Sequence, residues 1–194
     1  SIKSSISLPD EFEKIKGYTN IVYAGNIGLA QEWDLIINLA KEIKEFKITI
    51  WIVGEGQRKP YLESKIIKNE LDNIKLLPYY DRKFMPAINL FADIHFIAMN
   101  KKVEKYGFPS KVYTIMASGK PILVVSSEGT PIVSFLKEIN AALLVTDHSI
   151  SRFKEELLKL HNSVDLRNKL GANGRQEIKK KYSKQVVVEQ YLRL

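Results

Sequence analysis

The sequence contains no cysteine among its 194 residues, which excludes disulfide frameworks, thiolate metal sites and thiol nucleophiles. It also lacks any uninterrupted run of about 18 apolar residues, the length that a membrane-spanning helix needs. Residues 1–8 lack the apolar core of a signal peptide. The composition, 45% hydrophobic and 27% charged residues, is that of a globular chain, so disordered and collagen-like classes are excluded and one domain is expected.

Positive charge exceeds negative charge, but unevenly along the chain. The formal net charge is +8, and residues 150–194 hold 11 Lys and Arg against 5 Asp and Glu, while the preceding residues are close to balance. A general nucleic-acid-binding surface is therefore not indicated, and no nucleic acid is expected as a partner. The densest basic run predicts either a solvated helix face or a patch for anionic lipid headgroups or phosphate. It comprises Arg175, Lys179, Lys180, Lys181 and Lys184.

Short apolar runs alternate with helical patterns. The apolar runs predict about six strands, at 21–24, 48–53, 74–77, 94–98, 122–125 and 141–145. Helical spacing of apolar residues predicts helices over 29–43, 59–69, 86–91 and 111–117, another from 132, and helices only from 150 onward. Strands that are apolar on both faces and separated by helices predict an α/β fold with a doubly wound, Rossmann-like parallel sheet. Residues 1–19 are expected to be a mobile lead-in, and residues 20–194 the single domain.

In such a sheet, ligands lie beyond the carboxyl ends of the strands, so the residues that follow each strand are the candidates for function. Glycines there let a ligand approach the backbone, and free N–H groups at a helix start favour an anion. Both of the first two turns suit a phosphate-bearing ligand, with plain tight turns as the alternative, and neither is a dinucleotide fingerprint. The candidates after these two strands are Gly25, Asn26, Gly28, Gly54, Gly56 and Arg58.

The third strand is followed by Pro78, Tyr79 and Tyr80. Two aromatic rings at a ligand-binding edge could border a flat base, and the alternative is that one of them belongs to the core.

The segment after the fourth strand is the most informative, because it ends in Pro109, Ser110 and Lys111 at a helix start. Proline is tolerated in the first turn of a helix, where its missing N–H is not needed. The free N–H groups of Ser110 and Lys111 would point out at the strand ends, and Lys111 adds charge. Together they predict an anion site, the alternative being a capped helix with a solvated lysine.

Other chemistries find little support in the sequence. The three histidines, His95, His148 and His161, are scattered, and His95 lies within a predicted strand, where a core histidine is expected. No spacing of histidines and acids supports a metal site, and neither a G-x-S-x-G elbow nor a P-loop occurs. Neither a metal nor a cofactor is therefore expected.

The strand-end segments, in this order, resemble the C-terminal domain of retaining GT-B glycosyltransferases of group 1, the GT4 family. Residues 22–28 with Gln31 look like the family's first strand and glycine turn, and residues 52–56 are similar to its VGxG segment. The most specific part is PSKVYTIMASGKPI at 109–122, which resembles the branch that makes bacterial surface polysaccharides. Residues 170–175, LGANGR, also look like the family's tail.

The resemblance implies one half of a GT-B fold that binds a UDP-sugar without a bound metal. The base would lie near residues 77–80, and the diphosphate would meet the Gly25 turn and the N–H groups of Ser110 and Lys111. The implied activity is a hexosyltransferase-type transfer, with retention, to a glycan or lipid-linked acceptor in polysaccharide biosynthesis. It also implies a cytoplasmic location, with peripheral contact to the inner face of the membrane as a further expectation.

In the family, an N-terminal domain supplies the acceptor site and closes over the donor, and nothing in this sequence corresponds to it. We therefore expect an excised donor-binding half that is inactive alone, because closure normally excludes water and completes the site.

The sequence also departs from the family's pattern. The arginine and lysine that the family usually carries near the first glycine turn correspond to Asn26 and Gln31. Its two glutamates correspond to Tyr106 and Thr114, of which Thr114 could hydrogen-bond a ribose only weakly. Glu104 could replace the first acid through a shifted loop. No catalytic residue is assigned, and the candidate nucleotide-sugar-binding residues are Gly25, Asn26, Gly28, Gln31, Gly54, Gly56, Arg58, Pro78, Tyr79, Tyr80, Glu104, Pro109, Ser110, Lys111 and Thr114.

These departures leave two other functions open. One is a degenerate, non-catalytic glycosyltransferase-like module that recognises a partner or a glycan. The other is a nucleotide-sugar epimerase with a related fold of two domains, which would turn over without an acceptor. Measurable binding of a UDP-sugar would favour the donor domain over the degenerate module.

Overall fold

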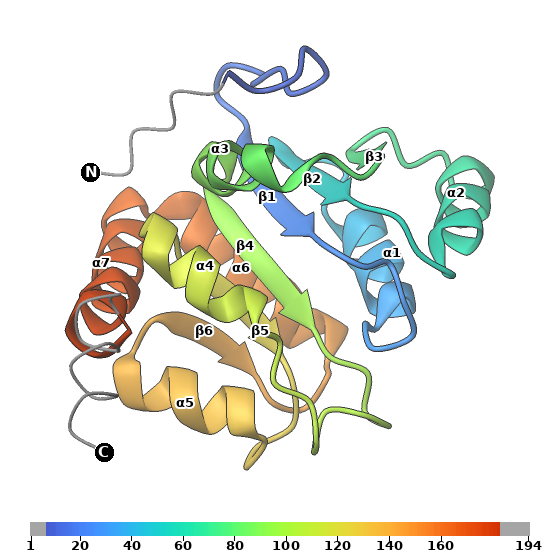
Figure 1. Cartoon of the computed structure of the whole chain (residues 1–194). Helices are drawn as coiled ribbons and strands as arrows, with labels where there is room; N and C mark the ends of the chain where they lie inside the picture. The colour runs from blue at the N-terminus through green and yellow to red at the C-terminus, as the bar shows by residue number, and fades with distance from the viewer. Residues whose placement is uncertain (1–6, 183–194) are drawn as a thin grey trace.

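Six parallel strands form the centre of a computed structural model that describes residues 7–182 (Figure 1). The order across the sheet is β3-β2-β1-β4-β5-β6, so the predicted doubly wound, Rossmann-like sheet is confirmed. All six predicted strands are present, with bounds that differ from the prediction by at most two residues. They are β1 (Thr19–Ala24), β2 (Ile48–Val53), β3 (Ile74–Leu77), β4 (Ile94–Ala98), β5 (Ile122–Val125) and β6 (Ala142–Val145).

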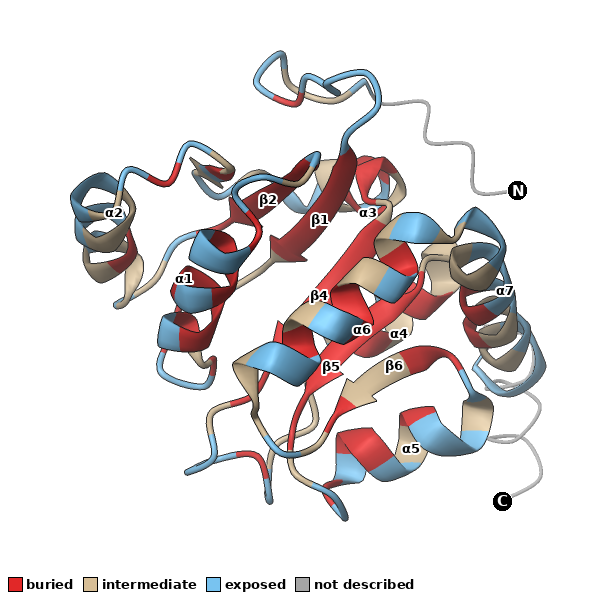
Figure 2. Ribbon diagram, turned by 180° about the vertical axis from the view of Figure 1, so that it is seen from behind, coloured by how far each residue is buried: buried red, intermediate tan, exposed pale blue. Residues whose placement is uncertain are grey.

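Helices cover both faces of the sheet, as Figures 1 and 2 show from opposite sides. Side chains of α1, α2 and α6 pack on one face, and those of α3, α4 and α5 on the other, with α7 against α4. The bounds are α1 (Trp33–Glu42), α2 (Lys59–Lys68), a 3-10 turn (Arg82–Phe84), α3 (Met85–Phe91), α4 (Lys111–Ser118), α5 (Pro131–Ile139), α6 (Ile150–Asn162) and α7 (Val164–Lys181).

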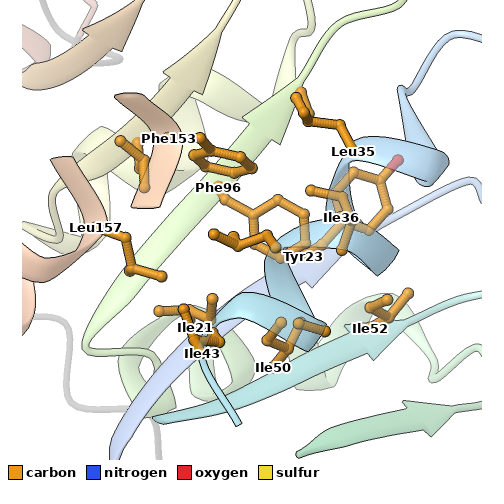
Figure 3. Close-up of a cluster of buried hydrophobic side chains, with 14 of the residues drawn as sticks. Ile21, Tyr23, Leu35, Ile36, Ile43, Ile50, Ile52, Phe96, Phe153 and Leu157 are labelled. Carbon is orange, nitrogen blue, oxygen red and sulfur yellow. The ribbon is translucent and has the colours of Figure 1, made fainter. Parts of the chain in front are cut away.

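The sheet is buried on both faces because successive strand residues point to opposite sides. Tyr23 in β1 belongs to the cluster drawn in Figure 3, where strand side chains meet those of α1 and α6. Its ring lies edge-on to Trp33 of α1, with the ring centroids 5.1 Å apart. Val22 packs on the other face, in a cluster with Ile88 of α3. This alternation explains why the strands read as nearly continuous apolar runs.

Phe12 ties the segment before β1 to the domain. Its side chain is buried, stacks on Trp51 at 5.7 Å between centroids, and meets Phe91 edge-on at 5.3 Å. Within the expected lead-in of residues 1–19, Phe12 thus packs on the domain, and Thr19 already belongs to β1. Residues 1–6 lie outside the described part.

Helix α1 begins at Trp33 rather than near residue 29. The preceding segment instead continues the hydrogen-bonding of β4, because the N–H of Glu32 donates to the carbonyl of Ala98 at 2.8 Å. Gln31 forms an isolated antiparallel bridge with Met99. Leu29, which the periodicity assigned to the helix, is 61% exposed. A turn at the end of β1 therefore occupies residues 25–32.

The basic run from Arg175 to Lys181 lies on α7, where Lys181 pairs with Glu177 at 2.7 Å between Nζ and Oε1. Lys184 lies outside the described residues. Within residues 7–182, no helix combines the length and apolar character that crossing a bilayer requires.

Two glycines allow α7 to pack closely. A Cβ on Gly171 would lie 2.0 Å from the carbonyl oxygen of Gly119, and one on Gly174 would lie 3.1 Å from Met116 Cγ. The LGANGR motif is thus explained by close packing of α7 against the end of α4.

We predict that Gly171→Ala lowers the free energy of unfolding by about 2 kcal/mol, because overpacking a closed interface has this typical cost. Alanine in an unconstrained helix interior would instead stabilise by roughly 1 kcal/mol relative to glycine, so the sign of the effect is diagnostic. Urea denaturation of the two proteins measures it. An unchanged or raised stability would contradict the close contact with Gly119.

Candidate functional site

The carboxyl ends of the central strands meet at one edge of the sheet. In the ladders, Ala24 of β1 lies opposite Val53 of β2, and Ala98 of β4 lies opposite Val125 of β5. The strand order reverses between β1 and β4. At such a point the connections run to opposite faces of the sheet and leave a crevice, which makes this edge the place to look for a ligand.

The turns after β1 and β2 approach each other closely. Gly54 has a φ of +151°, and a Cβ there would lie 2.0 Å from the carbonyl oxygen of Gly25. A Cβ on Gly56 would lie 2.4 Å from the carbonyl oxygen of Ile27 and 2.5 Å from Asn26 Oδ1. Only glycine fits this backbone conformation and this contact. The structure thus brings Gly25, Asn26, Gly54 and Gly56 together, as their positions after neighbouring strands predicted.

Lys111 points its ammonium group beneath the Gly25 turn. Its Nζ is buried, although the residue as a whole is half-buried, and lies 3.6 Å from the centroid of the Tyr23 ring. A Cβ on Gly25 would be 2.7 Å from this nitrogen, so the missing side chain leaves the space that Nζ uses. Within residues 7–182, Nζ has no hydrogen-bond partner. Burial lowers the pKa of Lys111 to about 7.

The start of α4 lies at the same edge. Pro109 and Ser110 precede the helix, and the first backbone bonds run from the N–H of Val112 to Pro109 and from that of Tyr113 to Ser110. In the part of the chain that the structure describes, the N–H groups of Ser110 and Lys111 have no acceptor. Free donors at a helix start attract anions, and the helix dipole acts in the same sense.

A cavity of about 360 Å³ opens beside Lys111, between α3 and α4 and over β1 and β4. Its lining is mostly apolar, and Thr114 contributes a hydroxyl that donates to the carbonyl of Lys111 at 2.9 Å. Arg82 and Met85 also line it. Neither residue was among those that the sequence indicated, although both lie within five positions of the predicted base-binding segment at 77–80. A mostly apolar cavity next to a cation suits a ligand with a flat ring and an anionic group.

His95 lies under this cavity as a core histidine, which confirms the expectation. It is buried, and its Nε2 donates to the carbonyl of Asn89 at 3.1 Å. Burial lowers the pKa of His95 to about 4, so it is neutral near pH 7.

The remaining candidates around the glycine turns are held by protein contacts. Gly28 accepts a hydrogen bond from Trp33 Nε1 at 2.7 Å. Gln31 is buried, and its Nε2 donates to Met99 Sδ at 4.0 Å. The guanidinium of Arg58 stacks on the Tyr61 ring, with Cζ 3.8 Å from the centroid. These three residues are therefore engaged by the protein itself.

The aromatic pair after β3 does not line the cavity. Tyr80 packs into the hydrophobic cluster around Phe12, with the two ring centroids 5.5 Å apart. Tyr79 is 63% exposed, and Pro78 is exposed beside it. The alternative that one of the tyrosines belongs to the core is thus the correct one for Tyr80.

Glu104, the candidate replacement for the family's first acid, is held by protein contacts. It is 2% exposed, and its carboxylate accepts hydrogen bonds from Ser126, Ser127 and His148. Both oxygens already have partners, so the structure shows Glu104 engaged by the protein itself. The contacts come from loops after β5 and β6, which sequence spacing could not bring together.

Among residues 7–182, no group of three or more His, Asp or Glu side chains is placed to hold a metal ion.

A family model described as glycosyl transferases group 1 matches residues 6–177. The chain belongs to this family. The similarity to group 1 glycosyltransferases that the sequence motifs indicated is thereby confirmed.

Three similar proteins show the extent of the similarity. WcaI of Escherichia coli, named as a glycosyl transferase of colanic acid biosynthesis, is 25% identical over 170 residues, which are 84% of this chain and 40% of that protein. Among solved structures, a mutant of S. aureus TarM in complex with fondaparinux, alpha-GlcNAc-glycerol and UDP has a TM-score of 0.75 at 19% identity, covering 97% of this chain and 37% of that one. Anabaena HepE with UDP and glucose has a TM-score of 0.75 at 12% identity, covering 92% and 49%.

This group 1 chain therefore spans less than half the length of each of these three proteins. The structural likeness confirms the fold, one Rossmann-like half of the kind found in GT-B glycosyltransferases.

We predict that Lys111→Met raises the melting temperature at pH 6 and that the gain shrinks toward pH 10. The pKa of Lys111 is about 7 in the folded protein and near 10.5 when unfolded, so the unfolded chain binds more protons between these values. Wild-type stability should rise with pH across this window, whereas methionine has no proton to lose. Thermal unfolding at pH 6, 8 and 10 measures the difference. A gain of equal size at all three pH values would contradict a buried, titrating ammonium.

Proposed function

We propose that the chain is the nucleotide-sugar-binding half of a glycosyltransferase and that its donor is a UDP-sugar. The observation that carries the proposal is the buried Lys111 ammonium between the Gly25 turn and the start of α4, which has no hydrogen-bond partner among residues 7–182. It stands at the switch point of the sheet in a chain of the group 1 family. The structures of TarM and HepE, both named as complexes with UDP, support the choice of nucleotide.

The diphosphate would lie against the Gly25 turn and the N–H groups of Ser110 and Lys111. The Lys111 ammonium and the helix dipole would offset its negative charge, which supports transfer without a bound divalent ion. The acceptor hydroxyl oxygen would form a bond to the anomeric carbon while the bond from that carbon to the β-phosphate oxygen breaks. UDP would leave with that electron pair, and the hydroxyl proton would pass to the leaving phosphate oxygen. The same positive groups would then stabilise the leaving diphosphate more than the donor, which is how such groups accelerate a reaction.

The cavity between α3 and α4 would hold the nucleoside. Its apolar walls suit the faces of a base, and Thr114 and Arg82 offer polar contacts at its border. This differs from the sequence-based assignment of the base to residues 77–80, since Tyr80 packs into the core.

The rest of the proposal concerns the whole protein. We propose retention at the anomeric carbon, a hexosyl donor and a glycan or lipid-linked acceptor held by a second domain, in the synthesis of a surface polysaccharide. WcaI, named for colanic acid biosynthesis, supports this pathway class. A cytoplasmic location, with peripheral membrane contact through the basic face of α7, belongs to the same proposal.

We predict that the chain binds UDP with a dissociation constant in the micromolar to millimolar range and that EDTA leaves the affinity unchanged. Lys111→Met should weaken binding by at least about tenfold, because a charge-assisted contact to phosphate is lost. Isothermal titration with UDP, with and without EDTA, measures both effects.

The matched control is Lys120→Met, which removes a half-buried lysine at the opposite edge of the sheet, before β5. It should bind UDP like the wild type. If the wild-type chain does not bind UDP, the proposal is contradicted and the degenerate module is favoured. Equal affinities of the two lysine variants for UDP would contradict the role of Lys111.

A further inference from the structure

A buried polar cluster lies beside the candidate donor site, at the carboxyl ends of β4, β5 and β6. Glu104 comes from the loop after β4, Ser126 and Ser127 follow β5, and His148 follows β6. Three loops that are far apart in the sequence therefore meet at one carboxylate.

The carboxylate of Glu104 has partners on both oxygens. Oε2 accepts from Ser126 Oγ at 3.0 Å, from the N–H of Ser127 at 2.9 Å and from His148 Nε2 at 3.0 Å, and Oε1 accepts from Ser127 Oγ. Burial alone would raise the pKa of Glu104, but these hydrogen bonds outweigh it and hold the pKa below its usual value. Glu104 is therefore an ionised acceptor near pH 7, which is the state that can take all four donors.

The cluster is not a nucleophilic triad. In such triads the serine and the acid contact different nitrogens of the histidine ring. Here Ser127 Oγ lies 3.4 Å from His148 Nε2, the same nitrogen that meets Glu104. A proton cannot be relayed through the ring in this arrangement, so the cluster is better explained by what it holds in place.

His148 has a strained backbone conformation and an unsatisfied ring nitrogen. Its φ is +56°, a left-handed conformation that non-glycine residues adopt at a cost. Its Nδ1 is buried and has no hydrogen-bond partner among residues 7–182. Both features cost free energy and persist only where surrounding contacts fix the geometry. Here the contact that offsets the cost is the hydrogen bond to Glu104.

The loop that Glu104 anchors leads directly into α4. The loop is tied at its start, where the N–H of Asn100 donates to the carbonyl of Ala30 in the turn after β1 at 2.9 Å. It ends at Ser110 and Lys111, the proposed diphosphate-binding groups. Between these ends, the side chains around Glu104 are exposed, namely Lys101, Lys102, Val103, Lys105 and Tyr106. Glu104 is thus the buried anchor of an otherwise solvent-facing segment.

We propose that Glu104 is a positioning residue for the donor site. Its carboxylate clamps the loop 99–110 onto the loops after β5 and β6 and so fixes the start of α4 where it can bind a diphosphate. The inference rests on the proposed function, since it concerns the same site.

The test compares wild type, Glu104→Gln and Ser127→Ala by two measurements, UDP titration and amide hydrogen exchange of the unliganded chain. Glutamine cannot accept all four donors, so exchange over residues 100–111 should accelerate while the central strands exchange as before. The affinity for UDP should fall by about tenfold or more, because the binding-competent loop is then only partly populated. Ser127→Ala removes one hydroxyl donor and keeps the N–H, so an intermediate effect is expected on both readouts.

Glu156→Gln is the matched control. Glu156 is also a buried glutamate, but it lies on α6 and pairs with Lys159 at 2.8 Å, away from the clamp. This variant should keep wild-type exchange over residues 100–111 and wild-type UDP affinity. A uniform acceleration in all strands of Glu104→Gln would indicate a general structural role and contradict positioning.

The outcomes separate this inference from the proposed function. If the wild type binds UDP and a folded Glu104→Gln binds it equally well, the positioning role is overturned and the donor site stands. If the wild type does not bind UDP, the donor site itself is overturned. Should Glu104→Gln fail to fold, Ser127→Ala decides by the same two readouts, and wild-type behaviour of this variant would overturn the clamp.

Discussion

Burial of the Lys111 ammonium disfavours its charged form, and its neighbours compensate for this only in part. The Tyr23 ring face offers a cation–π contact at 3.6 Å, and the absent side chain of Gly25 leaves room for Nζ, yet no hydrogen bond forms within residues 7–182. A well-packed apolar side chain would serve the fold as well or better at such a place. A bound anion would supply the counter-charge that residues 7–182 do not provide, so the lysine is understandable as a ligand-binding group and not as a stabilising one.

The loops at the two halves of the carboxyl edge are held in place by different contacts. On the β1 and β2 side, the contact is between backbones, because the carbonyl of Gly25 lies so close to Gly54 that any side chain there would clash with it. On the β4 to β6 side, one ionised side chain, that of Glu104, collects donors from two other loops. Lys111 lies at the meeting of the two halves, next to Gly25 and at the end of the loop that Glu104 holds.

The fold could be predicted from the sequence because its signals are local. Apolar runs such as 48–53 and 122–125 mark strands buried on both faces, and the order of strands and helices then leaves few topologies. The glycine turns and the PSK helix start could also be placed at one edge, since all strands of a parallel sheet end there. Contacts between distant segments could not be predicted. Tyr80 turns away to pack on Phe12, a residue in the expected lead-in, and nothing in the spacing of the sequence indicates either partner.

The departures from the family's pattern make the site depend more strongly on fewer groups. Where the family usually carries an arginine and a lysine near the glycine turn, this chain has Asn26 and the buried Gln31, neither of which is charged. Among the described residues that line the cavity, the lysine is Lys111 and the arginine is Arg82. With Lys111 as the cation closest to the turn, the attraction for a diphosphate depends on the position of the α4 start. That position in turn depends on the loop that Glu104 anchors. Without the arginine and the lysine at the glycine turn, donor binding therefore depends more strongly on the Glu104 clamp at the carboxyl ends of β4 to β6.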